Sequence, residues 1–369
     1  MNKMKRYLFL SIQIFWFILC STIFFSTYWM IEFDSLNNSC DYIIDETYVQ
    51  ICTNYKKNIF FGNLCPQLCD TSYDDYQIKL IDCPSSASHI GKDVVIFAEK
   101  LPNVSLVIKS KALIEEKLAE ISGIQNDIIG LSNVSLGQDL FSEDQLNDTN
   151  HCLLIKQHEY VLAKLFNDDY LYPKILYTCG HFYAVPKLNN IIDWTYLLPF
   201  PLQTSNDKII VAIDLLNFLK RFINTKLPME LCDVKYYHFG YNENGMLLLL
   251  DSDLIQSRHS LIDIIEHVTD CKIDDDCHFI DCHGKCHQGS CLLDMTDNNL
   301  KRICRNILFV GKLYSLLNMG LLAMPWSLLK NDEISIQQLY RLCFDVDHQN
   351  LNYIIKEMEK ILSNLLMHE

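Results

Sequence analysis

The hydrophobic pattern predicts mainly strands in the first half of the chain and helices in its last third. Residues 93–99 (DVVIFAE) and 104–109 (VSLVIK) predict two strands joined by a short connection. A helix predicted over 150–166 precedes the segment YPKILYTCGHFYAVPKL, which predicts two more strands around Cys179-Gly180. Further helices are predicted over 209–223, 300–318, 335–343 and 350–368. This order of elements predicts an α+β fold.

A hairpin is predicted in the middle of the chain, within LCDVKYYHFGYNENGMLLLLDSDL (231–254). The pair Asn244-Gly245 favours a type I′ turn, in which both central residues have positive φ. Apolar and aromatic residues on either side predict strands over Tyr236–Tyr241 and Met246–Leu250. Residues just outside the two strands should therefore lie close together.

Acidic residues occupy both open ends of this hairpin. Asp233 precedes it, and Asp251 and Asp253 follow it. Carboxylates held on a rigid ribbon suit a metal-phosphate site, in which one meets a substrate hydroxyl and another binds the cation. The alternative is a surface hairpin whose carboxylates are only solvated.

A run of twenty-five uncharged, mostly apolar residues spans 7–31 and is long enough to cross a bilayer as a helix. Lys3, Lys5 and Arg6 precede the run, whereas Glu32 and Asp34 follow it. The positive charges predict a cytoplasmic tail over residues 1–6, so the remainder is lumenal or extracellular. A cleaved signal peptide fits less well, because the run is too long and lacks a small-residue cleavage site.

Cysteines and glycosylation sequons agree with this orientation. The chain has 16 cysteines, and a count this high is unusual in a reducing compartment. Fifteen follow the apolar run, so at least one is free or pairs with another chain. Four N-x-Ser/Thr sequons also follow it, at Asn37, Asn103, Asn133 and Asn147.

Two cysteine clusters predict disulfides. Their members are Cys40, Cys52, Cys65, Cys69 and Cys83 in the first cluster, and Cys271, Cys277, Cys282, Cys286 and Cys291 in the second. Histidines within 271–291 make zinc an alternative there, although the cysteine spacing matches no common zinc finger. The formal net charge of −15 would repel phosphate backbones, so a nucleic-acid partner is excluded.

Several motifs, taken in order, resemble one known family. They are the basic tail with its apolar run, FFGNLCPQLC, QHEYVLAKL followed by ILYTCGHFYAVPKL, CDVKYYHFGY with LLLLDSD, and IDCHGKCHQGSC. This order resembles the divergent protein kinase domain 1 family of cysteine-rich, type II membrane proteins of the endoplasmic reticulum. Asp233-Val234-Lys235 stands where kinases have their catalytic D-L-K, and Asp251-Ser252-Asp253 where they have D-F-G.

The resemblance implies a bilobal protein-kinase-like fold behind a single N-terminal transmembrane helix, with ATP and Mg2+ or Mn2+ bound between the lobes. It assigns catalysis to Asp233 and Lys235. The phosphates fall to Lys109 with its partner Glu159, and Gly91 is what remains of a glycine loop. Asp251, Asp253 and His238 are the implied metal ligands.

The implied domain boundaries follow from these assignments. Residues 1–6 are the cytoplasmic tail, 7–31 the signal anchor, 32–90 a cysteine-rich lumenal segment, 91–190 an N-lobe with an insertion at about 122–149, and 191–369 a C-lobe with a cysteine-rich insert at 271–291. The implied location is the endoplasmic reticulum membrane, with the Golgi as the alternative.

Three functions follow for this chain. It is a lumenal kinase acting on secretory-pathway proteins, a pseudokinase scaffold that binds a partner without catalysis, or a disulfide-rich ectodomain without a kinase fold. Departures from the kinase pattern bear on the first two. His238 replaces the asparagine that binds a second metal, Ser252 replaces phenylalanine, and no arginine precedes Asp233.

Overall fold

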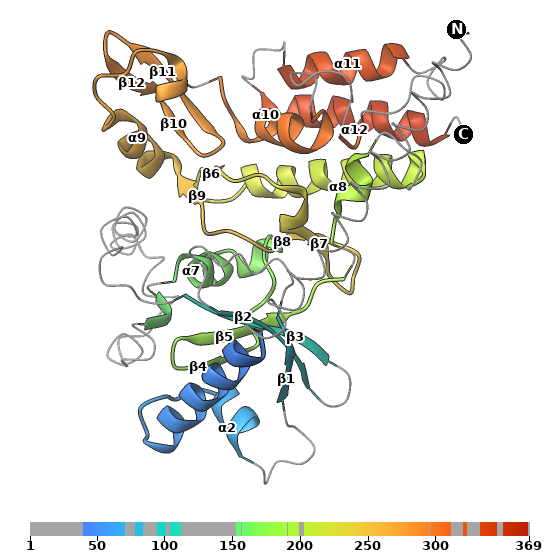
Figure 1. Cartoon of the computed structure of the whole chain (residues 1–369). Helices are drawn as coiled ribbons and strands as arrows, with labels where there is room; N and C mark the ends of the chain where they lie inside the picture. The colour runs from blue at the N-terminus through green and yellow to red at the C-terminus, as the bar shows by residue number, and fades with distance from the viewer. Residues whose placement is uncertain are drawn as a thin grey trace, which may run out of the picture. The chain divides into compact units, whose positions relative to one another are not determined.

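The computed structural model describes residues 40–70, 78–83, 94–100, 104–111, 153–155, 157–189, 191–198, 203–294, 296–310, 320–322, 333–344 and 350–367. The chain divides into two compact units (Figure 1). The N-terminal unit comprises residues 1–112 and 177–184, and the C-terminal unit comprises residues 113–176 and 185–369. Helices and sheets both occur, so the predicted α+β class is confirmed.

A five-stranded sheet in the order β1-β2-β3-β5-β4 forms the centre of the N-terminal unit (Figure 1). Its strands are β1 (Ile78–Asp82), β2 (Val94–Lys100), β3 (Val104–Ser110), β4 (Tyr177–Cys179) and β5 (Phe182–Pro186). The four strands predicted from alternating patterns are confirmed as β2 to β5. The pairing of β2 with β3 is antiparallel and places Val95 opposite Lys109.

Helical segments and disulfides cover one part of this sheet. A helix over residues 40–56 is joined to α2 (Leu64–Cys69) by the disulfide between Cys52 and Cys69. Cys65 of α2 is bonded to Cys179 at the end of β4. Gly180 adopts φ +60°, and a Cβ there would lie 2.6 Å from the Phe60 ring. Glycine is therefore required at position 180, where the β4–β5 turn packs against Phe60.

Helices dominate the C-terminal unit. They are α7 (His158–Leu165), α8 (Ser205–Ile223), α9 (Arg258–Glu266), α10 (Asn299–Ile303), α11 (Glu333–Phe344) and α12 (Leu351–Met367), with a π-helical turn η6 (Cys304–Leu308) after α10. Short 3₁₀ turns are η2 (Asn167–Asp169), η3 (Trp194–Leu197), η4 (Tyr236–His238) and η5 (Asp274–Asp276). One apolar core draws on α7, α8, α10, α11 and α12.

The N-terminus of α8 differs slightly from its prediction. The sequence predicted a helix over 209–223, but the helix begins at Ser205 and Thr204 is its N-cap. Its hydroxyl accepts from the Asp207 backbone N–H, while the Asp207 carboxylate accepts from the Thr204 N–H. This reciprocal capping box starts the helix earlier than the predicted Ile209, because it satisfies two otherwise unpaired donors.

The central hairpin is present, but its first strand is shorter than predicted. Strand β7 (Phe239–Tyr241) pairs antiparallel with β8 (Leu247–Leu249), Phe239 opposite Leu249. Residues 236–238, predicted as strand, form the 3₁₀ turn η4. The predicted two-residue turn is also wrong. The Gly245 N–H donates to the Asn242 carbonyl at 3.0 Å, and the Asn242 N–H donates to the Met246 carbonyl at 3.0 Å, so the loop has three residues.

Gly245 supplies the positive φ that this loop needs. Its φ is +72°, and a Cβ there would meet nothing within 4 Å. Gly245→Ala should therefore lower the free energy of unfolding by about 1 kcal/mol through backbone strain alone. Urea unfolding monitored by circular dichroism measures this change. An unchanged midpoint would show that the loop does not require the left-handed conformation.

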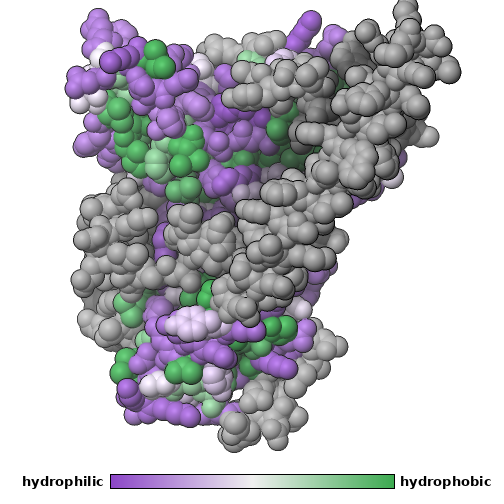
Figure 2. Space-filling view, viewed as in Figure 1, coloured by the Kyte–Doolittle hydropathy of each residue, from purple (hydrophilic) through white to green (hydrophobic). Residues whose placement is uncertain are grey.

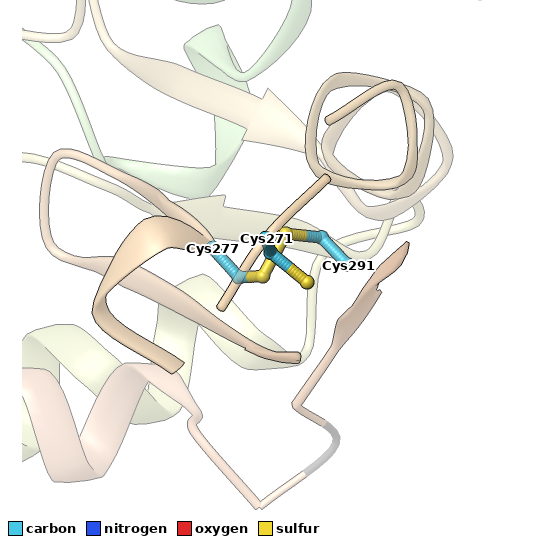
Figure 3. Close-up of side chains that lie close together, drawn as sticks. All are labelled: Cys271, Cys277 and Cys291. Atoms are coloured by element: carbon cyan, nitrogen blue, oxygen red, sulfur yellow. A yellow bond between two sulfur atoms is a disulfide. The ribbon is translucent and has the colours of Figure 1, made fainter. Parts of the chain in front are cut away.

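Three short strands form a separate small sheet in the C-terminal unit. They are β10 (His278–Phe279), β11 (Cys282–His287) and β12 (Ser290–Leu293), in that order. The disulfides Cys271–Cys286 and Cys277–Cys291 lie here, and Figure 3 shows the second with the Cys271 sulfur beside it. Because these sulfurs are oxidised, they are not zinc ligands, and the zinc alternative is wrong for these cysteines.

The ten cysteines predicted to form disulfides all do so, and four further cysteines join them. The seven disulfides of the described residues also include Cys40–Cys83, Cys232–Cys282 and Cys304–Cys343. Over the small sheet and α9, Figure 2 shows mainly hydrophilic residues with some hydrophobic residues between them. The exposed aliphatic residues of this part are Val268, Ile273, Ile280 and Leu292.

Several predicted features fall outside the described residues. They are the anchor at 7–31, Gly91, the insertion at about 122–149, and the sequons at Asn37, Asn103, Asn133 and Asn147. Among the helices that the structure does describe, none combines the length and the apolar character needed to span a membrane.

Candidate active site

Two antiparallel strands bring the acidic residues of the predicted site to the same end of a ribbon. Strand β6 (Met229–Leu231) pairs with β9 (Ile255–Ser257), and Leu231 lies opposite Ile255. Asp233 follows Leu231 by two residues, and Asp253 precedes Ile255 by two residues. Both carboxylate segments therefore leave the ribbon at its Leu231–Ile255 end.

His238 connects these two segments. The Nε2 atom of its buried ring lies 3.4 Å from Oδ2 of Asp251. Its Nδ1 atom lies 3.3 Å from the backbone carbonyl of Asp233. A carbonyl only accepts hydrogen bonds, so this contact places the proton on Nδ1. Nε2 faces the Asp251 carboxylate, with which it forms an ion pair when the ring is protonated.

Asp233 has a buried oxygen, Oδ1, whose contact with Lys235 is an ion pair and not a well-aligned hydrogen bond. Lys235 Nζ lies 3.0 Å from Oδ1 and 3.0 Å from Oδ2 of Asp233. Within the described part of the chain, Oδ1 is buried and takes part in no hydrogen bond of acceptable geometry. The ion pair with Lys235 compensates its charge, and a hydroxyl brought by a ligand could add the aligned hydrogen bond that Oδ1 lacks.

The environment of Lys235 keeps its ammonium charged. Partial burial lowers its pKa, but the hydrogen bond and the negative charge of Asp233 outweigh burial, so the pKa is raised above its ordinary value. The ammonium also lies 5.9 Å from the centroid of the Tyr237 ring. Lys235 is therefore a permanent positive charge beside Asp233 at neutral pH.

Two of the three metal-binding candidates, Asp251 and Asp253, lie in one short loop, and His238 faces it from η4. Oδ1 of Asp251 lies 3.4 Å from the Asp253 backbone N–H, which it accepts as a long hydrogen bond. Ser252 is buried between them, and its hydroxyl has no hydrogen-bond partner among the described residues. Two carboxylates and one imidazole offer oxygen and nitrogen donors, a set that Mn2+ accepts more readily than Mg2+ does.

Helix α10 holds the strand that precedes Asp233. The Asn299 side chain accepts from the Leu231 N–H at 2.7 Å and donates to the Met229 carbonyl at 2.9 Å. Arg302 is fully buried and donates to Glu230 at 2.8 Å and to Asp297 at 2.8 Å. These residues were not predicted from the sequence. The polar run Asp297-Asn298-Asn299 before an apolar helix was the available signal.

Glu159 and Lys109 are placed in different units. Glu159 lies in the first turn of α7, where it is partly buried. Burial of the Tyr172 hydroxyl, and then the charge of Glu159, raise the pKa of Tyr172. The His158 ring is within 2.9 Å of the Ile255 carbonyl, which ties α7 to the β6–β9 ribbon. Lys109 lies near the end of β3 in the N-terminal unit.

These features are typical of a protein-kinase-like domain. A family model described as the protein-kinase domain of FAM69 matches residues 152–343, which is more than half of the chain. A second model, described as the N-terminal cysteine-rich ER segment of FAM69, matches residues 1–129. The chain belongs to the FAM69 family, which confirms the predicted resemblance to divergent kinases.

The two matches also bear on location. The N-terminal description names the endoplasmic reticulum. The disulfides of the described residues fit an oxidising compartment, since such bonds are rare in the cytosol. Both observations agree with a lumenal position for the two units.

Proposed function

We propose that the chain is a lumenal protein kinase that transfers the γ-phosphoryl group of ATP to hydroxyls of secretory-pathway proteins. This proposal is supported by the buried Oδ1 atom of Asp233, which makes an ion pair with the Lys235 ammonium at 3.0 Å and no well-aligned hydrogen bond. Its segment is joined through His238 to Asp251. In phosphoryl transfer, a carboxylate orients the attacking hydroxyl, and nearby positive charge stabilises the transferring group.

The residues present suit a metal-bound nucleotide. Asp251 and Asp253 supply hard carboxylate oxygens, and His238 adds a nitrogen donor. A bound divalent cation would neutralise charge on the β- and γ-phosphates and align them for transfer. The family resemblance adds Lys109 for the phosphates and Glu159 as its partner.

The proposed step is a single displacement at phosphorus. The oxygen of the acceptor hydroxyl forms a bond to the γ-phosphorus, while the bond from that phosphorus to the β–γ bridging oxygen breaks and ADP leaves. Asp233 accepts the hydroxyl proton on Oδ1, and Lys235 stabilises the negative charge on the transferring oxygens. Atoms and charge balance, because the acceptor gains the phosphoryl group and loses one proton.

The imidazole at position 238 predicts a preference among metals. His238→Asn replaces nitrogen by an amide oxygen, which Mg2+ prefers. The ratio of the rate with Mn2+ to the rate with Mg2+ should therefore fall about tenfold in the variant. Initial rates at saturating concentrations of each metal measure this ratio. An unchanged ratio would remove His238 from the proposed metal site.

A pseudokinase scaffold of the endoplasmic reticulum is the second candidate function. Cys232 stands where kinases have arginine, and it forms a disulfide with Cys282. Ser252 replaces the phenylalanine of D-F-G. A chain of this kind would engage a lumenal partner without transferring phosphate. It would retain the fold and the disulfides described above.

A transfer assay separates the two functions. Full-length chain, purified in detergent from a secretory host, is incubated with γ-labelled ATP, Mn2+ and a mixture of secreted proteins. The kinase proposal expects label on serine, threonine or tyrosine hydroxyls above that given by the Asp251→Ala variant. Equal label from both proteins, or none from either with Mg2+ and with Mn2+, would favour the scaffold.

A further inference from the structure

The turn between β10 and β11 is fastened directly to the catalytic segment. The Asp281 backbone N–H donates to the Cys232 carbonyl at 2.8 Å. The Asp281 carboxylate accepts from the Val234 N–H at 2.7 Å. Cys282, the next residue, forms a disulfide with Cys232. Asp233 therefore lies between Cys232 and Val234, and the cysteine-rich insert is bonded to both of these neighbours.

The insert's other bonded carboxylates serve the insert itself. Asp274 accepts from the Cys286 N–H at 2.9 Å, and Asp276 accepts from the Lys272 N–H at 2.7 Å. The contacts of Asp281 instead reach a segment 47 residues earlier in the chain. The folding of the small sheet by itself does not require these contacts between Asp281 and the segment around Asp233.

The turn is held in a costly conformation. Ile280 has φ +54°, in the left-handed region that β-branched residues avoid. Such a conformation persists only where surrounding contacts determine it. Arg305 supplies one of these contacts by donating to the Asp281 carbonyl at 2.7 Å, and its other nitrogen lies 3.4 Å from Asp297. Asp297 in turn binds Arg302, which holds the strand before Asp233.

We propose that Asp281 is a positioning residue for Asp233, with the Cys232–Cys282 disulfide as its covalent support. The inference rests on the proposed function for its catalytic meaning, because it states how the base is held. Its carboxylate fixes the Val234 N–H, and its N–H fixes the Cys232 carbonyl. These two bonds set the backbone on each side of Asp233, which determines where the Oδ1 atom points.

Two substitutions at position 281 test this role in the full-length chain. Asp281→Asn keeps an oxygen that accepts from Val234, whereas Asp281→Ala removes it. Asp275→Ala is the matched control, because Asp275 is exposed in the same insert. Hydrogen exchange at the Val234 amide and the kinetic constants for phosphoryl transfer are measured for each protein.

Asp281→Ala should raise the exchange rate at Val234 about tenfold and lower kcat about tenfold or more, with KM for ATP within about twofold of wild type. Asp281→Asn and Asp275→Ala should stay within about twofold of wild type in all three quantities. Unchanged exchange and kcat in Asp281→Ala would overturn the inference, as would equal losses in Asp281→Asn.

A second variant guards against simple loss of folding. The double variant Cys232→Ser, Cys282→Ser keeps both bonds of Asp281, so exchange at Val234 should rise less than in Asp281→Ala. A larger rise in the Val234 exchange rate than in Asp281→Ala would contradict the proposal that Asp281 holds the segment and the disulfide only supports it. If wild type transfers no phosphate, the exchange results still decide whether Asp281 holds the segment, and only the proposed function fails.

Discussion

Asp233→Asn should lower kcat for phosphoryl transfer about 1000-fold, while KM for ATP changes little. The amide cannot accept the hydroxyl proton as a carboxylate does, and it loses the charge that holds Lys235 at 3.0 Å. Because transfer depends on positioning and charge rather than on covalent chemistry, the loss of one such group has a large effect. Rates with γ-labelled ATP and Mn2+ measure the change.

Glu243→Gln is the control for this substitution. Glu243 lies in the exposed loop of the central hairpin, on the same stretch of chain, and the change removes the same charge. Its kcat should match that of wild type. A loss of less than about tenfold in Asp233→Asn would argue against Asp233 as the proton acceptor.

Arg302→Met should lower the free energy of unfolding by about 3–5 kcal/mol. The guanidinium is fully buried and binds both Glu230 and Asp297 at 2.8 Å. Removing it leaves Asp297 with the longer ion pair to Arg305 at 3.4 Å and Glu230 with that to Arg258 at 3.8 Å. The cost comes from two buried charges that are then poorly compensated. The strand that leads to Asp233 should loosen as well. Chemical denaturation monitored by tryptophan fluorescence gives the value.

Lys301→Met is the matched control, since Lys301 is the neighbouring cation of α10 and is only partly buried. It should change stability by less than about 0.5 kcal/mol. Similar losses in the two variants would show that the Arg302 network is not the main stabilising feature of this region.

Local patterns predicted the elements that depend on local sequence. The strands β2 and β3 follow from alternating residues, and the hairpin β7–β8 follows from Asn244-Gly245 between apolar runs. The pattern failed at residues 236–238, where aromatic side chains favour strand but the backbone forms a 3₁₀ turn. In that turn His238 contacts both Asp233 and Asp251, so tertiary contacts override the local preference.

Long-range partners could not be predicted from the sequence. Composition indicated disulfides, but no spacing rule pairs Cys65 with Cys179 at a separation of 114, or Cys232 with Cys282 at 50. Asn299 and Arg302 look like an ordinary helix start. Their role appears only when the fold places α10 against β6, where they satisfy backbone and charge that would otherwise be buried alone.

A binding titration of ATP with Mn2+ into the full-length chain, compared with Asp251→Ala, tests the proposed metal-nucleotide site. We expect saturable binding to wild type that requires the metal, and an affinity about 100-fold lower in the variant. No binding to wild type, or equal affinity in the two proteins, would contradict a metal-nucleotide site at Asp251.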